Sequence, residues 1–260
     1  MRIFVSGGAP LGRELAEFFG AVGLLVLEGY GLTETSPVIA VNLPQAMRPG
    51  TVGKAVPGVE VKIAPDGEIV TRGPNVMKGY FNKPDATREV LEPDGWFHTG
   101  DIGEIDADGF LRITDRKKDL IVTAGGKNIA PQPIENIVRT SKWVLNAVML
   151  GDRRAYPIML VVPNLALLRE WARRHSYTFV DDDALLSRPE THEKIEREVK
   201  RMLRDLARYE VPKRLVLVKE DFSIEAGELT PTLKVRRKIV EQRYKERIEA
   251  AYLEGPGGQA

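Results

Sequence analysis

The chain has 260 residues, of which 43% are hydrophobic and 29% charged, and its net charge is +1. These are the values of a globular protein with one large or two ordinary domains, and they provide no long-range attraction for nucleic acid. Cysteine is absent, which excludes disulfides and a cysteine nucleophile and fits a reducing, cytoplasmic location. The sequence contains no signal peptide and no apolar run of about 18 residues, so we expect a soluble chain without a transmembrane segment.

The first 45 residues carry an α/β pattern. A short apolar strand is predicted at residues 3–5, a glycine loop follows, and apolar residues at helical spacing predict a helix over about residues 12–19. A second strand is predicted at residues 24–27. This order of strand, helix and strand indicates a parallel sheet with helical cover.

Residues 50–114 show a different pattern, with short strands separated by turn signals such as Pro65-Asp66-Gly67. A short helix over residues 84–90 is predicted from the proline at its first turn. The predicted strands cover residues 59–63, 68–71, 103–105 and 110–113. Short strands with frequent turns indicate a small, mostly antiparallel sheet or barrel.

A charged segment at residues 115–120 suggests a domain boundary at about Arg116/Lys117. We therefore expect a mixed α+β fold with a first domain over residues 1–116, divided into an α/β part (1–45) and a β-rich part (46–116), and a second domain over 117–260. The second domain is predicted to contain helices at 133–140, 165–175, 191–207 and 235–252 and strands at 144–150, 158–162 and 214–218.

The stretch that follows the predicted strand 24–27 has the residue types of a nucleotide site. Gly29 and Gly31 flank Tyr30, and Thr33 and Glu34 follow. Glycine lets a backbone approach a flat ligand, tyrosine stacks on a base, threonine donates to phosphate, and glutamate binds a hard cation such as Mg²⁺. The alternative is a glycine-rich turn with a threonine that caps a helix.

Further motifs follow in a fixed order. They are WFHTGD at residues 96–101, TDRKKDL at 114–120, GGKNIAP at 125–131 and LTPTLK at 229–234. In this order the chain resembles the adenylate-forming superfamily of acyl-CoA synthetases, luciferases and peptide-synthetase adenylation domains. It looks most similar to the long-chain fatty-acid–CoA ligases.

The resemblance implies a two-step reaction in which ATP and a fatty acid form an acyl-adenylate and pyrophosphate, and coenzyme A then takes the acyl group. It implies ATP/AMP, Mg²⁺ and coenzyme A as cofactors or cosubstrates, with Glu34 at the metal and Thr33 among the catalytic residues. The implied nucleotide-binding residues are Gly8, Ala9, Pro10, Gly29, Tyr30, Gly31, Asp101 and Arg116.

Lys234 matches the family's catalytic lysine, whose ammonium stabilises the approach of carboxylate to phosphate. Lys118 matches the hinge, and Gly125 and Gly126 the coenzyme A channel. Plainer interpretations remain: a surface lysine at a helix start, a solvated linker, a Gly-Gly hairpin turn, and for Asp101 a turn residue.

The superfamily's members are considerably longer and carry a Ser/Thr/Gly-rich phosphate loop that these 260 residues lack. We therefore expect the C-terminal half of a synthetase that is inactive alone. The alternative is a non-catalytic nucleotide-binding or interaction subunit of a split or remnant enzyme. Residues 1–45 should then expose strand edges or apolar faces and lead to self-association, local disorder or pairing with an N-terminal half.

Overall fold

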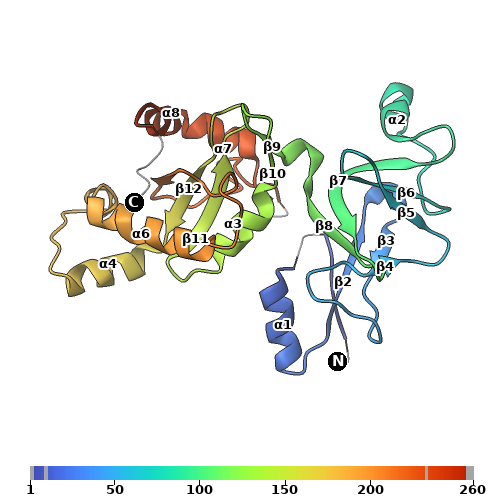
Figure 1. Ribbon diagram of the computed structural model, residues 1–260, viewed down its shortest axis with the longest axis horizontal. Coiled ribbons are helices and arrows are strands. Elements are labelled where there is room, and N and C mark those ends of the chain that lie inside the picture. Colours follow the sequence, from blue (N-terminus) through green and yellow to red (C-terminus); the bar gives the residue numbers. More distant parts are fainter. Residues whose placement is uncertain (1–2, 9–10, 232–233, 256–260) are drawn as a thin grey trace. The chain divides into compact units, whose positions relative to one another are not determined.

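The computed structural model, shown in Figure 1, describes residues 3–8, 11–231 and 234–255 of a mixed α/β chain. The chain divides into two compact units, residues 1–118 and residues 119–260.

The first unit begins with a four-stranded sheet in the order β1-β2-β3-β4. Its elements are β1 (Phe4–Ser6), α1 (Arg13–Ala21), β2 (Val26–Gly31), the 3₁₀ turn η1 (Thr33–Thr35), β3 (Val38–Val41) and β4 (Lys54–Ala55). β1 and β2 are parallel, and the other pairs are antiparallel, so the predicted strand–helix–strand unit is confirmed.

The second strand was predicted wrongly at both ends. It begins two residues later than residues 24–27 and runs through Gly31, so the glycine-rich motif is itself part of the sheet. Gly29 and Tyr30 pair with Val41 and Ala40 of β3. The pairing with β3, the next strand along the chain, outweighs the weak strand preference of the glycines.

A second four-stranded sheet follows in the order β5-β6-β7-β8, antiparallel throughout, as the sequence predicts. Its elements are β5 (Glu60–Ile63), β6 (Glu68–Arg72), α2 (Pro84–Val90), β7 (Phe97–Ile105) and β8 (Leu111–Arg116). The strand expected at 103–105 is much longer, because β7 pairs with β6 and β8 on its two sides. The 96–101 motif therefore lies largely in a strand, and Asp101 is directly opposite Arg116.

The buried core of the first unit joins its two sheets. Tyr30 and Ile39 of the first sheet pack in one apolar cluster with Ile69 and Leu111 of the second. Backbone hydrogen bonds from Val52 N to Leu111 O (2.9 Å) and from Leu111 N to Gly53 O (2.8 Å) reinforce this junction. The end of β2 is thereby held against β6, β7 and β8.

The second unit is built on a three-stranded sheet in the order β11-β12-β13. Its elements are η2 (Lys117–Asp119, which crosses the division between the units), β9 (Ile121–Val122), β10 (Asn128–Ile129), α3 (Pro131–Arg139), β11 (Val144–Leu150), β12 (Ile158–Pro163), α4 (Leu165–Arg174), α5 (Asp182–Leu186), α6 (Pro189–Met202), β13 (Arg214–Leu217), α7 (Arg237–Arg243) and α8 (Lys245–Leu253). β12 is buried along its whole length, because helices cover both faces of the sheet.

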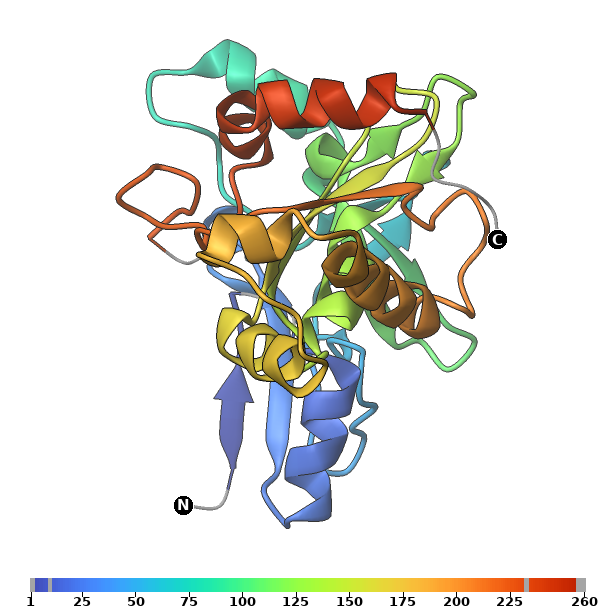
Figure 2. The ribbon, with the colours of Figure 1, turned by 90° about the vertical axis from the view of Figure 1, so that its left-hand side faces the viewer.

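Figure 2 shows these two layers, with α7 and α8 in red on one face and α4 to α6 in yellow to orange on the other. One core cluster contains Leu168, Leu185 and Ile195 beside one face of the strands. The other contains Val240 and Ile248 beside the opposite face. Side chains alternate between the two faces along β11 and β12, so each strand contributes residues to both clusters.

Three predicted helices of this unit differ at their ends from the observed ones. The helices expected at 133–140 and 191–207 begin earlier, at Pro131 and Pro189, and the second ends at Met202. Proline suits the first helical turn, where no amide donor is needed. The single closing helix expected at 235–252 is two helices that meet at Tyr244.

None of the helices formed by the described residues has both the length and the apolar character needed to cross a membrane.

An exposed apolar surface lies on α1. Leu15, Phe18 and Val22 are spaced three and four residues apart and are 47%, 59% and 57% exposed. On the edge strand β1, Val5 is 75% exposed. The apolar face expected near the start of the sequence is thus present, and such surfaces promote association.

We expect the chain to self-associate through the α1 face. Phe18→Ser combined with Val22→Ser should shift light scattering across a concentration series toward the mass of the monomer, 29.0 kDa, because both changes remove exposed apolar area. Phe81→Ser, which removes an isolated ring that is 89% exposed, is the control. A monomeric wild-type chain at all concentrations would contradict the expectation.

Candidate functional site

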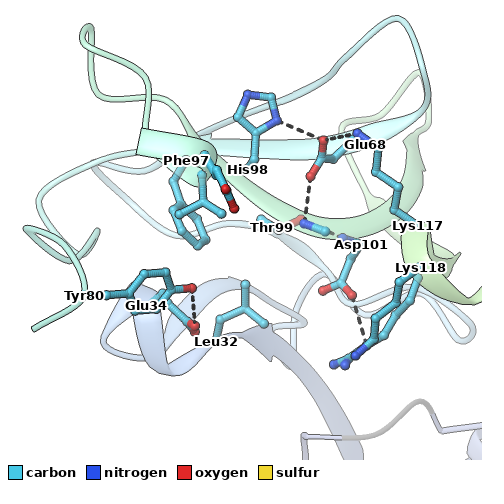
Figure 3. Close-up of a pocket in the computed structure, with 14 residues that line it drawn as sticks. Leu32, Glu34, Glu68, Tyr80, Phe97, His98, Thr99, Asp101, Lys117 and Lys118 are labelled. Atoms are coloured by element: carbon cyan, nitrogen blue, oxygen red, sulfur yellow. Dashed lines mark hydrogen bonds and ion pairs between the residues drawn. The ribbon is translucent and has the colours of Figure 1, made fainter. Parts of the chain in front are cut away.

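The first unit contains a polar pocket of about 600 Å³. Its walls come from the turn after β2, from β6 and β7, from α2 and the loop before it, and from the end of β8 with the two residues that follow (Figure 3). Its charged lining residues are Glu34, Glu68, Glu89, Asp101, Arg116, Lys117 and Lys118. Carboxylates and cations side by side suit a ligand that carries both hydroxyl groups and anionic oxygens.

Asp101 lies at the back of this pocket between two partners from other strands. Its Oδ2 accepts a hydrogen bond of 2.7 Å from the hydroxyl of Tyr30, and its Oδ1 lies 3.3 Å from Nε of Arg116. Asp101 is only 5% exposed and Tyr30 7%. Burial, followed by the charge of Asp101, raises the pKa of the Tyr30 phenol, so the hydroxyl remains a neutral donor.

The structure therefore brings together Tyr30, Asp101 and Arg116, which the sequence singles out. It changes the role expected for the ring of Tyr30. The ring of Tyr30 packs in the core of the first unit, and its hydroxyl supports Asp101. Only a small part of the ring is open to a stacking base. Asp101 lies in a strand and not in a simple turn.

Gly31 has a steric reason to be glycine. A Cβ built on it would lie 1.6 Å from the carbonyl oxygen of Pro37, whereas one on Gly29 would meet Val41 Cγ2 at 3.7 Å. Thr35 holds the Pro37 carbonyl in this position beside Gly31. Its hydroxyl donates to that carbonyl (2.7 Å) and accepts from the amide of Leu32 (2.9 Å). The sequence analysis did not single out Thr35, which is fully buried.

Glu34 lines the pocket and Thr33 is exposed beside it in the same turn. The hydroxyl of Tyr80 donates to Glu34 Oε1 at 3.0 Å, and burial together with this carboxylate raises the pKa of Tyr80. Tyr80 belongs to none of the recognised motifs, so the sequence offered no signal for it. Among the residues that the structure describes, no cluster of three or more histidine or acidic residues could hold a metal ion.

Glu68 is the most highly connected acid of the pocket. Its side chain, 3% exposed, accepts hydrogen bonds from the Gly100 amide (2.8 Å), His98 Nδ1 (2.9 Å) and Lys117 Nζ (2.9 Å). Burial opposes ionisation, but these donors outweigh it, so the pKa of Glu68 lies below its ordinary value. Sequence reasoning gave Glu68 and His98 no role, because their partnership depends on pairing between β6 and β7.

Some predicted residues lie elsewhere. Gly8 has a positive φ of 79° with no atom near its missing Cβ, and Ala9 and Pro10 lie outside the described residues. Gly125 and Gly126 form the turn of the β9–β10 hairpin in the second unit, where the amide of Gly126 donates to Thr123 O at 2.8 Å. The hairpin interpretation is thus correct as local structure. The loop leaves open space beside Gly126, whereas a Cβ on Gly125 would meet Thr123 Oγ1 at 4.0 Å.

Lys234 ends a short loop in the second unit. The amide of Thr230 donates to Lys234 O (2.8 Å), the Lys234 amide donates to Thr230 Oγ1 (3.0 Å), and Leu229 forms a bridge with Val235. Residues 232–233 lie outside the described residues. Lys234 therefore lies in a hairpin-like loop before α7 and not on the helix itself.

A buried acid holds the base of this loop. Glu228 is completely buried, and its carboxylate accepts from the Ser223 amide (3.1 Å) and lies 2.9 Å from Nη1 of Arg243. Its carbonyl accepts from the Arg236 amide at 2.7 Å. The loop is thus joined to α7 at the side opposite its tip.

Comparison with known proteins assigns the chain to a family. The family model for AMP-binding enzymes matches residues 1–81, and the model for the AMP-binding enzyme C-terminal domain matches residues 118–255. The chain belongs to the AMP-binding enzymes, the adenylate-forming family that its motifs resemble.

Curated relatives include long-chain fatty-acid–CoA ligases. The chain is 42% identical over 254 residues to the long-chain-fatty-acid–CoA ligase FadD15 of Mycobacterium tuberculosis, covering 96% of this chain and 42% of the relative. It is 35% identical over 272 residues to the long-chain-fatty-acid–CoA ligase ACSBG1 of Homo sapiens, covering 95% of this chain and 37% of the relative. The chain thus spans about two fifths of the length of these relatives.

Solved structures show the same fold. The A-PCP didomain of carboxylic acid reductase from Segniliparus rugosus, in complex with AMP, matches with a TM-score of 0.76 and 26% identity over 97% of this chain and 34% of that chain. The ATP-bound RpMatB-BxBclM chimera B1 matches with a TM-score of 0.73 and 31% identity over 95% and 46% of the two chains. The predicted mixed fold of an adenylation domain is confirmed.

The contacts of Gly31 predict that it tolerates no side chain. Gly31→Ala should destabilise the first unit by about 3 kcal/mol or more, because the new methyl group overlaps a backbone oxygen. Gly29→Ala, whose methyl meets only an ordinary contact, should cost less than about 1 kcal/mol. Denaturant unfolding of both variants measures the difference, and equal losses would contradict the prediction.

The contacts of His98 predict that the stability of the first unit depends on pH. Hydrogen bonding to Glu68 raises the pKa of His98 against the opposing effect of burial, and Glu92 adds to the rise. The protonated ring therefore contributes stability that is complete below its unfolded-state pKa of about 6.5 and is lost as pH rises through the higher folded-state pKa. The other charged groups of this cluster are Lys117 and Asp66, which contact Glu68 or each other.

The measurement is the difference in unfolding free energy between the wild type and His98→Gln as a function of pH. This difference should be largest at about pH 6 and should shrink toward alkaline pH. A difference that stays constant or grows with rising pH would contradict the assignment. His175→Gln, at an exposed histidine of α4's end, is the control.

Proposed function

We propose that the chain carries the C-terminal part of a long-chain fatty-acid–CoA ligase. In this proposal residues 1–116 are the distal part of the large adenylate-forming domain, and residues 117–260 are the mobile domain after a hinge at Lys118. The reaction converts ATP, a fatty acid and coenzyme A to acyl-CoA, AMP and pyrophosphate through an acyl-adenylate. The pair of Asp101 and Arg116 in the pocket of an AMP-binding enzyme, with Tyr30 hydrogen-bonded to Asp101 from behind, carries the proposal.

Asp101 is proposed to accept the ribose hydroxyls of the nucleotide. Both oxygens of a carboxylate accept hydrogen bonds, and the contacts with Tyr30 and Arg116 fix the orientation of this carboxylate. We assign the adenine to the exposed part of Tyr30 and to the Gly29–Gly31 and Gly8-Ala9-Pro10 segments.

Glu34 is proposed to hold Mg²⁺ at the phosphates, with Thr33 donating to a phosphate oxygen. A single pocket carboxylate fits this ion, since Mg²⁺ at nucleotide sites takes one or two protein carboxylates and completes its shell with phosphates and water. The ion would supply neutralising charge, and Tyr80 would orient the carboxylate through its hydrogen bond.

Lys234 is proposed to stabilise the negative charge that accumulates when the fatty-acid carboxylate meets the α-phosphate. Rotation at Lys118 would then bring the Gly125–Gly126 loop to the site for the attack of the coenzyme A thiol. The open space beside Gly126 supports close passage of an extended ligand arm. Hinges of this kind are formed by a few residues at an element's end, as at η2.

We also propose that turnover needs the family's phosphate loop, which the 260 residues do not contain. The share of the relatives' length that the chain spans, 42% for FadD15, supports this requirement. The missing phosphate loop also fits the alternative, in which the chain is a nucleotide-binding or interaction subunit and no mixture shows turnover.

ATP–pyrophosphate exchange with palmitate tests the proposal. The chain is assayed alone and with the separately produced N-terminal part of FadD15 that has no counterpart in these residues. We expect exchange only in the mixture. Lys234→Ala should lower it by about 10²–10³-fold, the loss of one preorganised charge of about 3–4 kcal/mol, while thioester formation from supplied palmitoyl-AMP continues.

Lys238→Ala, at an exposed lysine of α7, is the matched control and should leave both steps unchanged. Equal losses of adenylation and thioester formation in Lys234→Ala would refute the role given to Lys234. Exchange in no mixture, with AMP still bound by the chain, would favour the non-catalytic subunit.

A further inference from the structure

The carboxylate of Glu68 collects donors from two segments that are far apart in the sequence. Its Oε1 accepts the amide of Gly100 at 2.8 Å, and its Oε2 accepts Nζ of Lys117 at 2.9 Å. His98 adds a third donor to Oε2 at 2.9 Å. Figure 3 shows this junction above Asp101.

Gly100 and Lys117 have special positions relative to the proposed ribose site. Gly100 immediately precedes Asp101, and Lys117 immediately follows Arg116, and Asp101 and Arg116 are paired across β7 and β8. One buried acid thus holds both neighbours of the pair. A movement of either segment that separated Asp101 from Arg116 would first have to break a contact with Glu68.

Lys117 has a second anion at its ammonium. Nζ lies 2.7 Å from Oδ2 of Asp66, which is in the turn just before β6. The side chain of Lys117 is nevertheless 49% exposed, so its ion pairs with Glu68 and Asp66 are each weak. By contrast, Lys118 makes no side-chain hydrogen bond or ion pair to any described residue, and the division between the compact units falls immediately after it.

We propose that Glu68 is a positioning residue that anchors Lys117 to the first unit, so that rotation between the units begins at Lys118 and leaves Arg116 beside Asp101. The inference rests on the proposed function, which gives Asp101 and Arg116 the ribose and Lys118 the hinge. Its physical reason is the cost of an unpaired buried carboxylate, which favours states in which Lys117 and Gly100 remain in place.

Limited trypsin digestion of the folded chain tests the anchor directly. Trypsin must take the lysine side chain into its own pocket, so contacts of Lys117 slow cleavage after Lys117 but not after Lys118. We expect Glu68→Gln to raise the ratio of cleavage after Lys117 to cleavage after Lys118 by about threefold to fivefold, as loss of a partly exposed ion pair implies. The sequence around the two cleavage sites is identical in the wild type and in Glu68→Gln. A change in the ratio therefore reports the loss of the contact between Glu68 and Lys117.

The matched control is Glu60→Gln, a carboxylate on the neighbouring β5 that contacts Arg72 and not the linker; it should leave the ratio unchanged. The midpoint of thermal unfolding is measured for every variant. An unchanged ratio in a folded Glu68→Gln chain overturns the proposal. If Glu68→Gln does not fold, Lys117→Gln alters only a half-exposed side chain and should raise cleavage after Arg116, and an unchanged rate there overturns the proposal equally.

Binding of AMP, measured by equilibrium dialysis, separates this inference from the proposed function. Glu68→Gln should weaken AMP binding about threefold or more through the Gly100–Asp101 segment, and Asp101→Asn should weaken it further. Unchanged AMP affinity in Glu68→Gln overturns the positioning of Asp101. A wild-type chain that binds no AMP refutes the nucleotide role of Asp101, whereas the cleavage ratio still decides whether Glu68 anchors the linker.

Discussion

The burial of the Asp101 carboxylate is the constraint on which the pocket depends. A buried charge is tolerated only when it is paired and hydrogen-bonded, and Asp101 meets this condition through Tyr30 and Arg116. The contact with Arg116 requires the register of β7 with β8, and the contact with Tyr30 requires β2 to pack against their sheet. The hydroxyl of Tyr30 reaches Asp101 only because the end of β2 packs against the second sheet of the unit.

Other buried acids act in the same way at other places. Glu68 joins β6 to the residues around Asp101 and Arg116, and Glu228 joins the loop of Lys234 to α7. In each case a carboxylate accepts a backbone amide and also meets a cation. Directional contacts of this kind specify the position of a loop more narrowly than apolar packing does, since a hydrogen bond weakens steeply with angle and distance.

The two units also differ in how they are built. The second unit surrounds a sheet with helices on both faces and has two extensive apolar clusters. The first has a smaller core, and one pocket brings together seven of its charged side chains. For the proposed ligase this division into two units would allow one unit to move while the other keeps the nucleotide. A rigid body can carry an ammonium and a glycine loop to a nucleotide in turn, provided that the nucleotide's own contacts remain with the other body.

The sequence alone predicted the kinds of elements and the family, and it singled out Glu34, Asp101, Arg116 and Lys118 among the residues that line the pocket. Strand 144–150 was predicted with its observed ends, because a short, mostly apolar run that stops at a glycine is a local signal. Motif order singled out Asp101, Arg116 and Lys234 as candidates, although it could not indicate that Tyr30 would donate to Asp101. The ends of β2 and β7 were missed because partner strands extend them through residues with weak strand preference.

Only the tertiary structure decided which side chains meet. Tyr30 and Asp101 are 71 residues apart, and Glu68 and Lys117 are 49 apart, so no pattern of local spacing connects them. The need for glycine at position 31 likewise arises from the carbonyl of Pro37 folding back against it. Local propensity and periodicity act over a few residues, whereas burial of a charge depends on every segment that packs around it.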